Sequence, residues 1–136
     1  MKVVNYTFSV RSSSGLELIN ITGEVRRAVR ESGVKSGICL VYTTHTTAAI
    51  VINEDEPGLR EDVARTVREL FKPGGGWKHD LVDSNAHAHL SSIYLGPAKV
   101  VPVVDGDLLL GTWQSIFFVE LDGPRSRRYH VTVMGD

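Results

Sequence analysis

Residues 37–53 read GICLVYTTHTTAAIVIN, two apolar runs on either side of the polar segment Thr44-His45-Thr46-Thr47. The runs at 37–43 and 48–53 are rich in β-branched residues and short for helices, so both predict buried strands. The polar segment then lies where two strands meet.

Amphipathic helices are predicted on both sides of these strands. The first begins at Thr22, an N-cap candidate, and ends at Gly33. The second opens at Pro57 and ends before Pro73. Their apolar positions, at three- and four-residue spacing, are Val25, Ala28 and Val29 in the first and Leu59, Val63, Val67, Leu70 and Phe71 in the second.

The remaining apolar segments predict further strands, at 3–10, 99–104, 107–110, 115–121 and 129–133. Asp105-Gly106 is a strong hairpin signal between two of them. The order β, α, β, β, α, followed by a meander of mostly antiparallel strands, predicts an α+β fold. We therefore expect one domain over residues 1–136, a mostly antiparallel β sandwich with two helices on one face.

Composition limits the possible functions. The chain has 136 residues with 15 Lys and Arg against 16 Asp and Glu, so it has no general field to attract nucleic acid or an anionic membrane. Its apolar runs are far below the roughly 20 residues that cross a bilayer, and residues 1–10 do not resemble a signal peptide. Phosphate-loop, dinucleotide-binding and zinc-finger motifs are absent. With Cys39 alone in an apolar run, we expect an unreactive thiol and a cytoplasmic protein.

Histidines carry the main functional signal. His45, His79, His87 and His89 lie in or beside apolar segments, whereas His130 has a routine strand position. A single histidine in such a place is usually a hydrogen-bonded core residue. Here carboxylates and amides of the kind that orient imidazole accompany the histidines, which favours a site. The candidate catalytic residues are His45, Asn53, Glu54, Asp62 and Asn85, and the candidate metal ligands are His45, His79 and His89.

Two other polar segments are candidates for substrate binding. The turn DGPRSRR at 122–128 places Arg125 and Arg127 between apolar strands, and arginine forks match phosphate oxygens. The alternative for this turn is a solvated hairpin tip. Trp113 and Gln114 lie between two strand runs, where they offer a wall for a flat heterocycle. The alternative for Trp113 is a core position.

Four motifs, in their order and spacing, resemble the YjbQ family. They are THTTAAI at 44–50 with INE at 52–54, SNAHAHLSS at 84–92, VPV at 101–103 with GTWQ at 111–114, and GPR at 123–125. The resemblance implies a compact α+β domain, assembly as a homotrimer and, for some members, thiamine phosphate synthase activity. The matching polar residues are His45, Asn53, Glu54, Asp62, His79, Asn85, His89, Gln114 and Arg125.

From the resemblance and the polar inventory we expect an enzyme of small-molecule phosphate chemistry. Its specific form would be a thiamine phosphate synthase, joining a pyrimidine diphosphate to a thiazole phosphate and releasing pyrophosphate. The alternative is a metal- or metabolite-binding trimer without significant catalysis. The expected cofactor is a divalent metal, Zn²⁺ or Mg²⁺, and the expected partners are a small phosphate substrate and further copies of the chain, with neither nucleic acid nor membrane.

Overall fold

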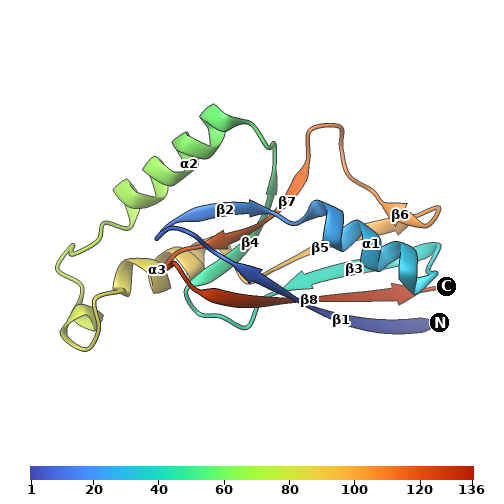
Figure 1. The fold of residues 1–136 in the computed structure, drawn as a ribbon, viewed down its shortest axis with the longest axis horizontal. Helices are drawn as coiled ribbons and strands as arrows, with labels where there is room; N and C mark the ends of the chain where they lie inside the picture. Colours follow the sequence, from blue (N-terminus) through green and yellow to red (C-terminus); the bar gives the residue numbers. More distant parts are fainter.

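The computed structural model describes all residues, 1–136, and consists of two β-sheets with helices at their edge and on one side (Figure 1). The larger sheet has five strands, all paired antiparallel, and its central strand β3 is the apolar run predicted as a strand at 37–43. In sheet order its strands are β1 (Lys2–Arg11), β8 (Ser126–Gly135), β3 (Ser36–Tyr42), β5 (Ala98–Val104) and β6 (Asp107–Leu108).

The smaller sheet has three antiparallel strands, β2 (Glu17–Asn20), β7 (Ser115–Glu120) and β4 (Ala48–Asn53). Its two longer strands carry unbroken apolar runs, AAIVI in β4 and IFFV in β7. Such runs suit strands that are covered on both faces. One face packs against the larger sheet, and the other is covered by helices.

The main core fills the space between the two sheets. Val41, Val101 and Val131 from the larger sheet pack there with Ile50 and Phe118 from the smaller one. A second apolar cluster lies on the opposite face of the smaller sheet, where Phe117 and Val119 meet residues of two helices. The alternation of side chains along β7 thus divides neighbouring phenylalanines between the two cores.

The helices differ in what they cover. Helix α1 (Thr22–Ser32) packs into the main core and ends at Gly33, whose φ of 74° is the left-handed conformation that glycine adopts without strain. Helix α2 (Pro57–Leu70) lies over the outer side of the smaller sheet, and Val67 is its one buried residue. Only α2 and α3 (Ala86–Leu95) cover that face, so the helices do not all share one side. None of the helices is both long and apolar enough to span a bilayer.

Several boundaries differ from the sequence prediction. The sequence predicts two helices, but the structure adds α3 and a short 3₁₀ helix, η1 (Lys78–Leu81), in the histidine-rich segment. Strand β2 was not expected, β6 is shorter than predicted, and β8 begins at Ser126 rather than at Tyr129. The sequence leaves open whether residues 85–89 are extended or helical. In the structure α3 begins at Ala86, and Asp80 Oδ1 accepts a hydrogen bond from its first backbone N–H at 3.0 Å.

The outer face of the five-stranded sheet carries no helix and changes character along its length. Towards one end, a nearly continuous apolar row crosses four strands and comprises Val3, Met134, Ile38 and Pro102, with Val100 and Val104 beside it. Towards the other end, β1 and β8 present Arg11 and Arg128 instead. This face is therefore apolar towards one end and carries two arginines towards the other.

Candidate functional site

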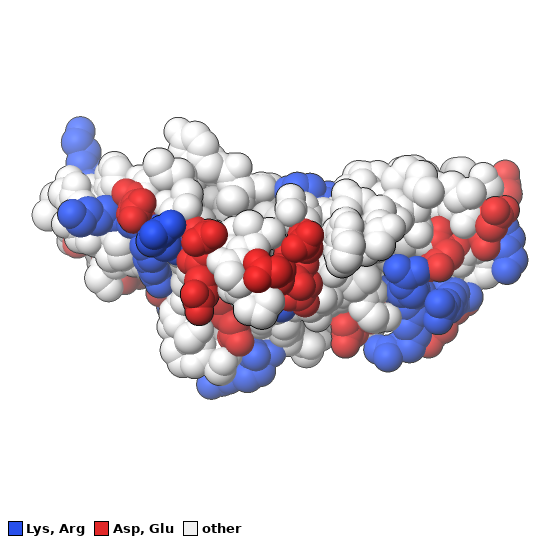
Figure 2. All heavy atoms as spheres, turned by 90° about the horizontal axis from the view of Figure 1, so that it is seen from above, with Lys and Arg blue, Asp and Glu red and all other residues white.

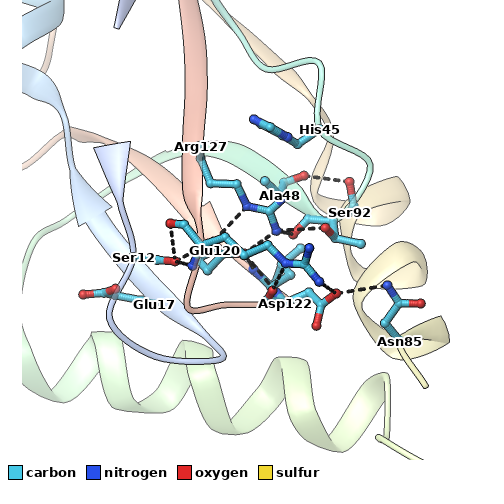
Figure 3. A network of polar contacts seen from close by, with 12 residues as sticks. Ser12, Glu17, His45, Ala48, Asn85, Ser92, Glu120, Asp122 and Arg127 are labelled. Atoms are coloured by element: carbon cyan, nitrogen blue, oxygen red, sulfur yellow. Dashed lines mark hydrogen bonds and ion pairs between the residues drawn. The ribbon is translucent and has the colours of Figure 1, made fainter. Parts of the chain in front are cut away.

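A polar pocket of about 390 Å³ lies between the loop that follows β3 and the inner side of α3. It is the only one of the larger hollows that contains two histidines, His45 and His89. The lining residues are Tyr42, Thr43, Thr44, His45, Thr46, His89, Ser92, Ile93 and Pro97. Ser92 anchors α3 here, because its hydroxyl donates to Ala48 O at the start of β4 at 2.6 Å (Figure 3).

The protonation state of His45 follows from its hydrogen bond. Its Nε2 accepts from the backbone N–H of Arg128 at 3.0 Å, so the proton of the neutral ring is on Nδ1. Burial lowers the pKa of His45, and the nearby Arg127 cation lowers it further. His45 is therefore held as a neutral imidazole whose remaining nitrogen is a hydrogen-bond donor.

A chain of polar contacts orients His79 of η1, and His89 of α3 packs against it. Asn85 Nδ2 donates to Asp122 Oδ2 at 3.0 Å, which leaves the amide oxygen of Asn85 facing His79 Nε2 at 3.2 Å. That nitrogen must then carry the proton, so the Nδ1 lone pair of neutral His79 is free. The ring of His89 lies edge-on to that of His79, with 4.8 Å between ring centroids. His89 in turn lines the polar pocket.

Beneath the pocket lies a buried ion pair. Arg127 Nε donates to Glu120 Oε1 at 2.9 Å, and both side chains are almost fully buried (Figure 3). Ser12 Oγ donates to Glu120 at 2.7 Å, and Thr47 Oγ1 accepts from Arg127 at 2.8 Å. Burial alone would raise the pKa of Glu120, but hydrogen bonds from Arg127 and Ser12 outweigh it and the pKa is lowered. The pair therefore stays ionised and ties together four separate segments.

His87 is a polar residue that our candidate set omitted. Its Nδ1 is the one buried side-chain polar atom without a hydrogen-bond partner in the structure. Burial lowers the pKa of His87, and the Arg68 guanidinium of α2 lowers it further. His87 is therefore neutral at the junction of α2 and α3, and it does not line the polar pocket.

Several predicted catalytic and stacking residues lie at the other end of the smaller sheet. Asn53 ends the strand that Ala48 begins, a separation of about 16 Å at roughly 3.3 Å per residue. Asn53 and Glu54 line an apolar hollow under α2. Trp113 is 72% exposed on the loop before β7, next to Gln114, whose Oε1 accepts from Gly111 N. One chain therefore does not bring these residues to the histidines.

Asp62 is also remote from the polar pocket. It lies on α2, exposed, and pairs with Arg65 at 3.5 Å. Seen from above (Figure 2), acidic side chains gather in the middle of the face, over the start of α2. The sequence there, EDEPGLRED at 54–62, has five carboxylates around one arginine. This region is unfavourable for an anionic ligand.

The two arginines predicted to bind substrate are engaged within the protein. Arg127 is buried in its ion pair with Glu120. Arg125 is exposed, but its guanidinium bonds Asp122 through both the backbone oxygen, at 2.7 Å, and the carboxylate, at 3.0 Å. Arg128, which we did not select, has no ion-pair partner. The structure thus places the free guanidinium one residue away from the predicted one.

The predicted three-histidine metal set is only partly assembled in one chain. His79 and His89 are adjacent, and His89 shares the pocket with His45. His45, however, uses its one lone pair to accept from Arg128, and no group of three or more His, Cys, Asp or Glu side chains is arranged to hold a metal ion. The metal site stays a prediction that this geometry does not favour. As expected, Cys39 is buried, and burial raises the pKa of its thiol to about 12.

Comparison with known proteins gives a consistent picture over almost the whole chain. The family model described as "UPF0047 protein YjbQ-like" matches residues 6–136. A UPF0047 protein of Archaeoglobus fulgidus is 48% identical over 126 residues, which cover 93% of this chain and 98% of the relative. A Bacillus subtilis UPF0047 protein, YugU, is 39% identical and covers 95% of this chain and 98% of its own.

Solved structures agree closely with this fold. A YbjQ-like protein of unknown function from Sulfolobus solfataricus superimposes with a TM-score of 0.98 at 48% identity, covering 99% of both chains. A hypothetical protein from Aeropyrum pernix gives a TM-score of 0.95 at 47% identity, covering 98% of this chain and 99% of the other. At such identity the likeness extends to the sequence as well as to the fold.

These matches correct the predicted function. None of the relatives is described as a thiamine phosphate synthase or as an enzyme of phosphate chemistry, and the Sulfolobus protein is described as one of unknown function. The synthase prediction came from the resemblance alone and is withdrawn. Arg125 and Arg127, which were predicted to bind the substrate phosphate, are already paired with carboxylates of the protein.

Proposed function

Since this chain belongs to the YjbQ-like UPF0047 family, whose matched members are described without an activity, we propose its function from the site itself: acid–base catalysis on a small polar ligand. The ligand occupies the pocket between β3 and α3, and the His79 and His89 pair exchanges a proton with it. The single observation that carries this proposal is the chain from Asp122 through Asn85 to His79.

The chain has the features that general acid–base work requires. Imidazole is the side chain whose ordinary pKa is nearest neutrality, and a base must present a lone pair of fixed orientation. Asp122 fixes the amide of Asn85, and the amide fixes His79 with its Nδ1 lone pair free. His89 stands between His79 and the pocket, 4.8 Å away by ring centroids, so it is the group that meets the ligand.

His45 has a different part in this proposal. Because Arg128 N–H occupies its Nε2, His45 can offer a ligand only the Nδ1 proton. A neutral donor of this kind stabilises an oxygen on which negative charge develops. Thr44, Thr46 and Ser92 supply further hydroxyl groups around the same pocket. A ligand with a carbonyl group fits this set of donors and bases.

The test is turnover of a panel of small esters, lactones and amides by the intact protein. His89→Ala should lower the rate by roughly 10²- to 10⁴-fold, and Asn85→Ala should lower it by releasing His79. Asn5→Ala, an exposed asparagine on the outer sheet face, is the matched control and should keep full turnover. Absence of turnover in the unaltered protein, or full turnover in His89→Ala, contradicts the proposal.

The same panel addresses the predicted metal. Imidazole ligands suit Zn²⁺ and are poor ligands for Mg²⁺, so of the two predicted ions only Zn²⁺ fits a pair of histidines. Turnover should be equal after chelation and after adding Zn²⁺. A rate that rises with Zn²⁺, and falls back in His89→Ala, would assign His79 and His89 to a metal in place of proton exchange.

We also propose that the chain assembles as a homotrimer, as the family resemblance implies. The support is the apolar half of the outer sheet face, where Ile38, Val100 and Val104 are 41%, 55% and 47% exposed in one chain. Patches of this kind usually lie at protein interfaces. Trp113, on a projecting loop, is a second exposed apolar group suited to a neighbouring copy.

Light scattering tests the assembly. The mass should be three times the chain mass of 15.0 kDa. Val100→Glu should reduce it to that of one chain, because a charge would be buried at the contact. Leu70→Glu, on α2 and 67% exposed, is the matched control and should remain trimeric. A single-chain mass for the unaltered protein would refute the trimer.

A further inference from the structure

The cationic end of the outer sheet face has a regular arrangement of donors. Ser9 pairs with Arg128 and Arg11 pairs with Ser126 in the antiparallel register of β1 and β8. Residues two apart on a strand share a face, so these four side chains form a block with the arginines on one diagonal and the serines on the other. They line a hollow of about 490 Å³.

The charges in this block are not balanced by the protein. Neither Arg11 nor Arg128 takes part in an ion pair, and β1 and β8 contain no Asp or Glu. Arg11 Nη1 donates to Ser126 Oγ at 3.0 Å. The hydroxyl proton of Ser126 and the other N–H groups of the Arg11 guanidinium can therefore bind another acceptor. Arg127 also borders the hollow, but Glu120 already neutralises it.

We propose that Arg11 and Arg128, with Ser9 and Ser126, bind a tetrahedral dianion, the sulfate or phosphate group of a small ligand. The two forks supply charge and paired N–H donors, and the two hydroxyls supply single donors between them. Four donor groups of net charge two match a tetrahedral dianion better than a planar carboxylate. The proposal concerns binding alone and does not rest on the proposed acid–base catalysis, although His45 lies beside both sites.

His45 provides an internal reporter for this site. It accepts from the backbone N–H of Arg128. The charged or titratable groups around it are Glu120, Arg127, Arg128 and His130, together with His89 across the pocket. The cationic neighbours disfavour protonation of His45, so a dianion held by Arg128 should favour it. Binding is therefore expected to raise the pKa of His45 and to tighten as the pH falls.

The experiment is titration of the intact protein with inorganic sulfate at low ionic strength, by calorimetry and by NMR of the histidine ring protons. Sulfate should bind in the unaltered protein and raise the pKa of His45. Arg11→Gln and Arg128→Gln should each weaken it about tenfold, the value of one hydrogen-bonded charge. Arg128→Lys, which keeps the charge but loses the fork, should lie between.

The control is Arg30→Gln, which removes the same charge from the exposed surface of α1 and should leave the sulfate affinity unchanged. Equal weakening by Arg30→Gln, or no weakening in the double variant at Arg11 and Arg128, would overturn the site. Acetate that bound as tightly as sulfate would overturn the dianion as its ligand. Inorganic phosphate should bind like sulfate, and failure of both ions to bind would also refute the proposal.

Discussion

Arg127 and Arg128 are neighbours in the sequence but serve opposite sides of β8. Arg127 points inward, is buried, and forms an ion pair with Glu120 that Ser12 and Thr47 complete. Arg128 points outward, is exposed, and has no carboxylate partner. The same residue type is therefore used once to hold the fold together and once to leave a charge available. Successive side chains of a strand point to opposite faces, and this strand parity decides which role each arginine has.

The largest expected effect concerns the buried ion pair of Arg127 and Glu120. Glu120→Leu leaves Arg127 buried and unpaired, which should lower the free energy of unfolding by about 3–5 kcal/mol. The double replacement Glu120→Leu with Arg127→Leu removes both charges and should recover most of that loss. Denaturant unfolding followed by circular dichroism measures both. Glu61→Leu, on the exposed side of α2, is the control, with a change within about 0.5 kcal/mol.

Equal destabilisation of the single and double variants would contradict a stabilising role for the pairing of Arg127 with Glu120. It would mean that the site tolerates neither charge nor apolar volume, and that packing rather than pairing decides the stability of this region. Recovery in the double variant would assign the loss to the uncompensated charge.

A smaller effect is expected for the hydroxyl that supports the pair. Ser12 Oγ donates to Glu120 at 2.7 Å and accepts from Arg125 N at 2.8 Å. Ser12→Ala should therefore cost about 1.5–3 kcal/mol of unfolding free energy, the range for a hydrogen bond to a charged group. Ser126→Ala, on the outer face, should cost much less because solvent can replace its bond to Arg11. Similar values for both serines would contradict the division between the faces.

The dependence of stability on pH should come from the inner side as well. Hydrogen bonds hold the pKa of Glu120 below its value in the unfolded chain, about 4.3. A lowered pKa contributes stability above the unfolded value, and the contribution is lost as the pH falls through the folded value. Unfolding free energy should thus drop below about pH 4. In the double leucine variant, the unfolding free energy should fall less below about pH 4. An unchanged pH profile would show that Glu120 is not the source of the dependence.

Strand parity explains much of what the sequence could and could not predict. Helix α2 and every strand except β2 follow from apolar runs, Pro57 and Pro73, and the structure has them within a few residues. The predicted strand began at Tyr129. The alternation of inward and outward side chains was therefore not extended to the arginines before it. Extended back to Ser126, the period that buries Tyr129 and Val131 also buries Arg127. That signal was present in the sequence.

Other features depend on tertiary contacts that no local pattern carries. The sequence left open whether residues 85–89 are extended or helical. One contact that holds helix α3, from Ser92 to Ala48, joins segments far apart in the chain. The tautomers of His45 and His79 likewise depend on Arg128 and Asn85. The grouping of Asn53 with the histidines was proposed from sequence spacing, and the length of β4 separates them.

The most direct test replaces each of the two neighbouring arginines by glutamine and measures two quantities on both variants, unfolding free energy and sulfate affinity. Arg127→Gln should lose about 3–5 kcal/mol of unfolding free energy. Arg128→Gln should keep its stability within about 0.5 kcal/mol but bind sulfate about tenfold more weakly. A stable Arg127→Gln, or an Arg128→Gln that loses stability while binding sulfate normally, would contradict the division of β8 into a structural face and a binding face.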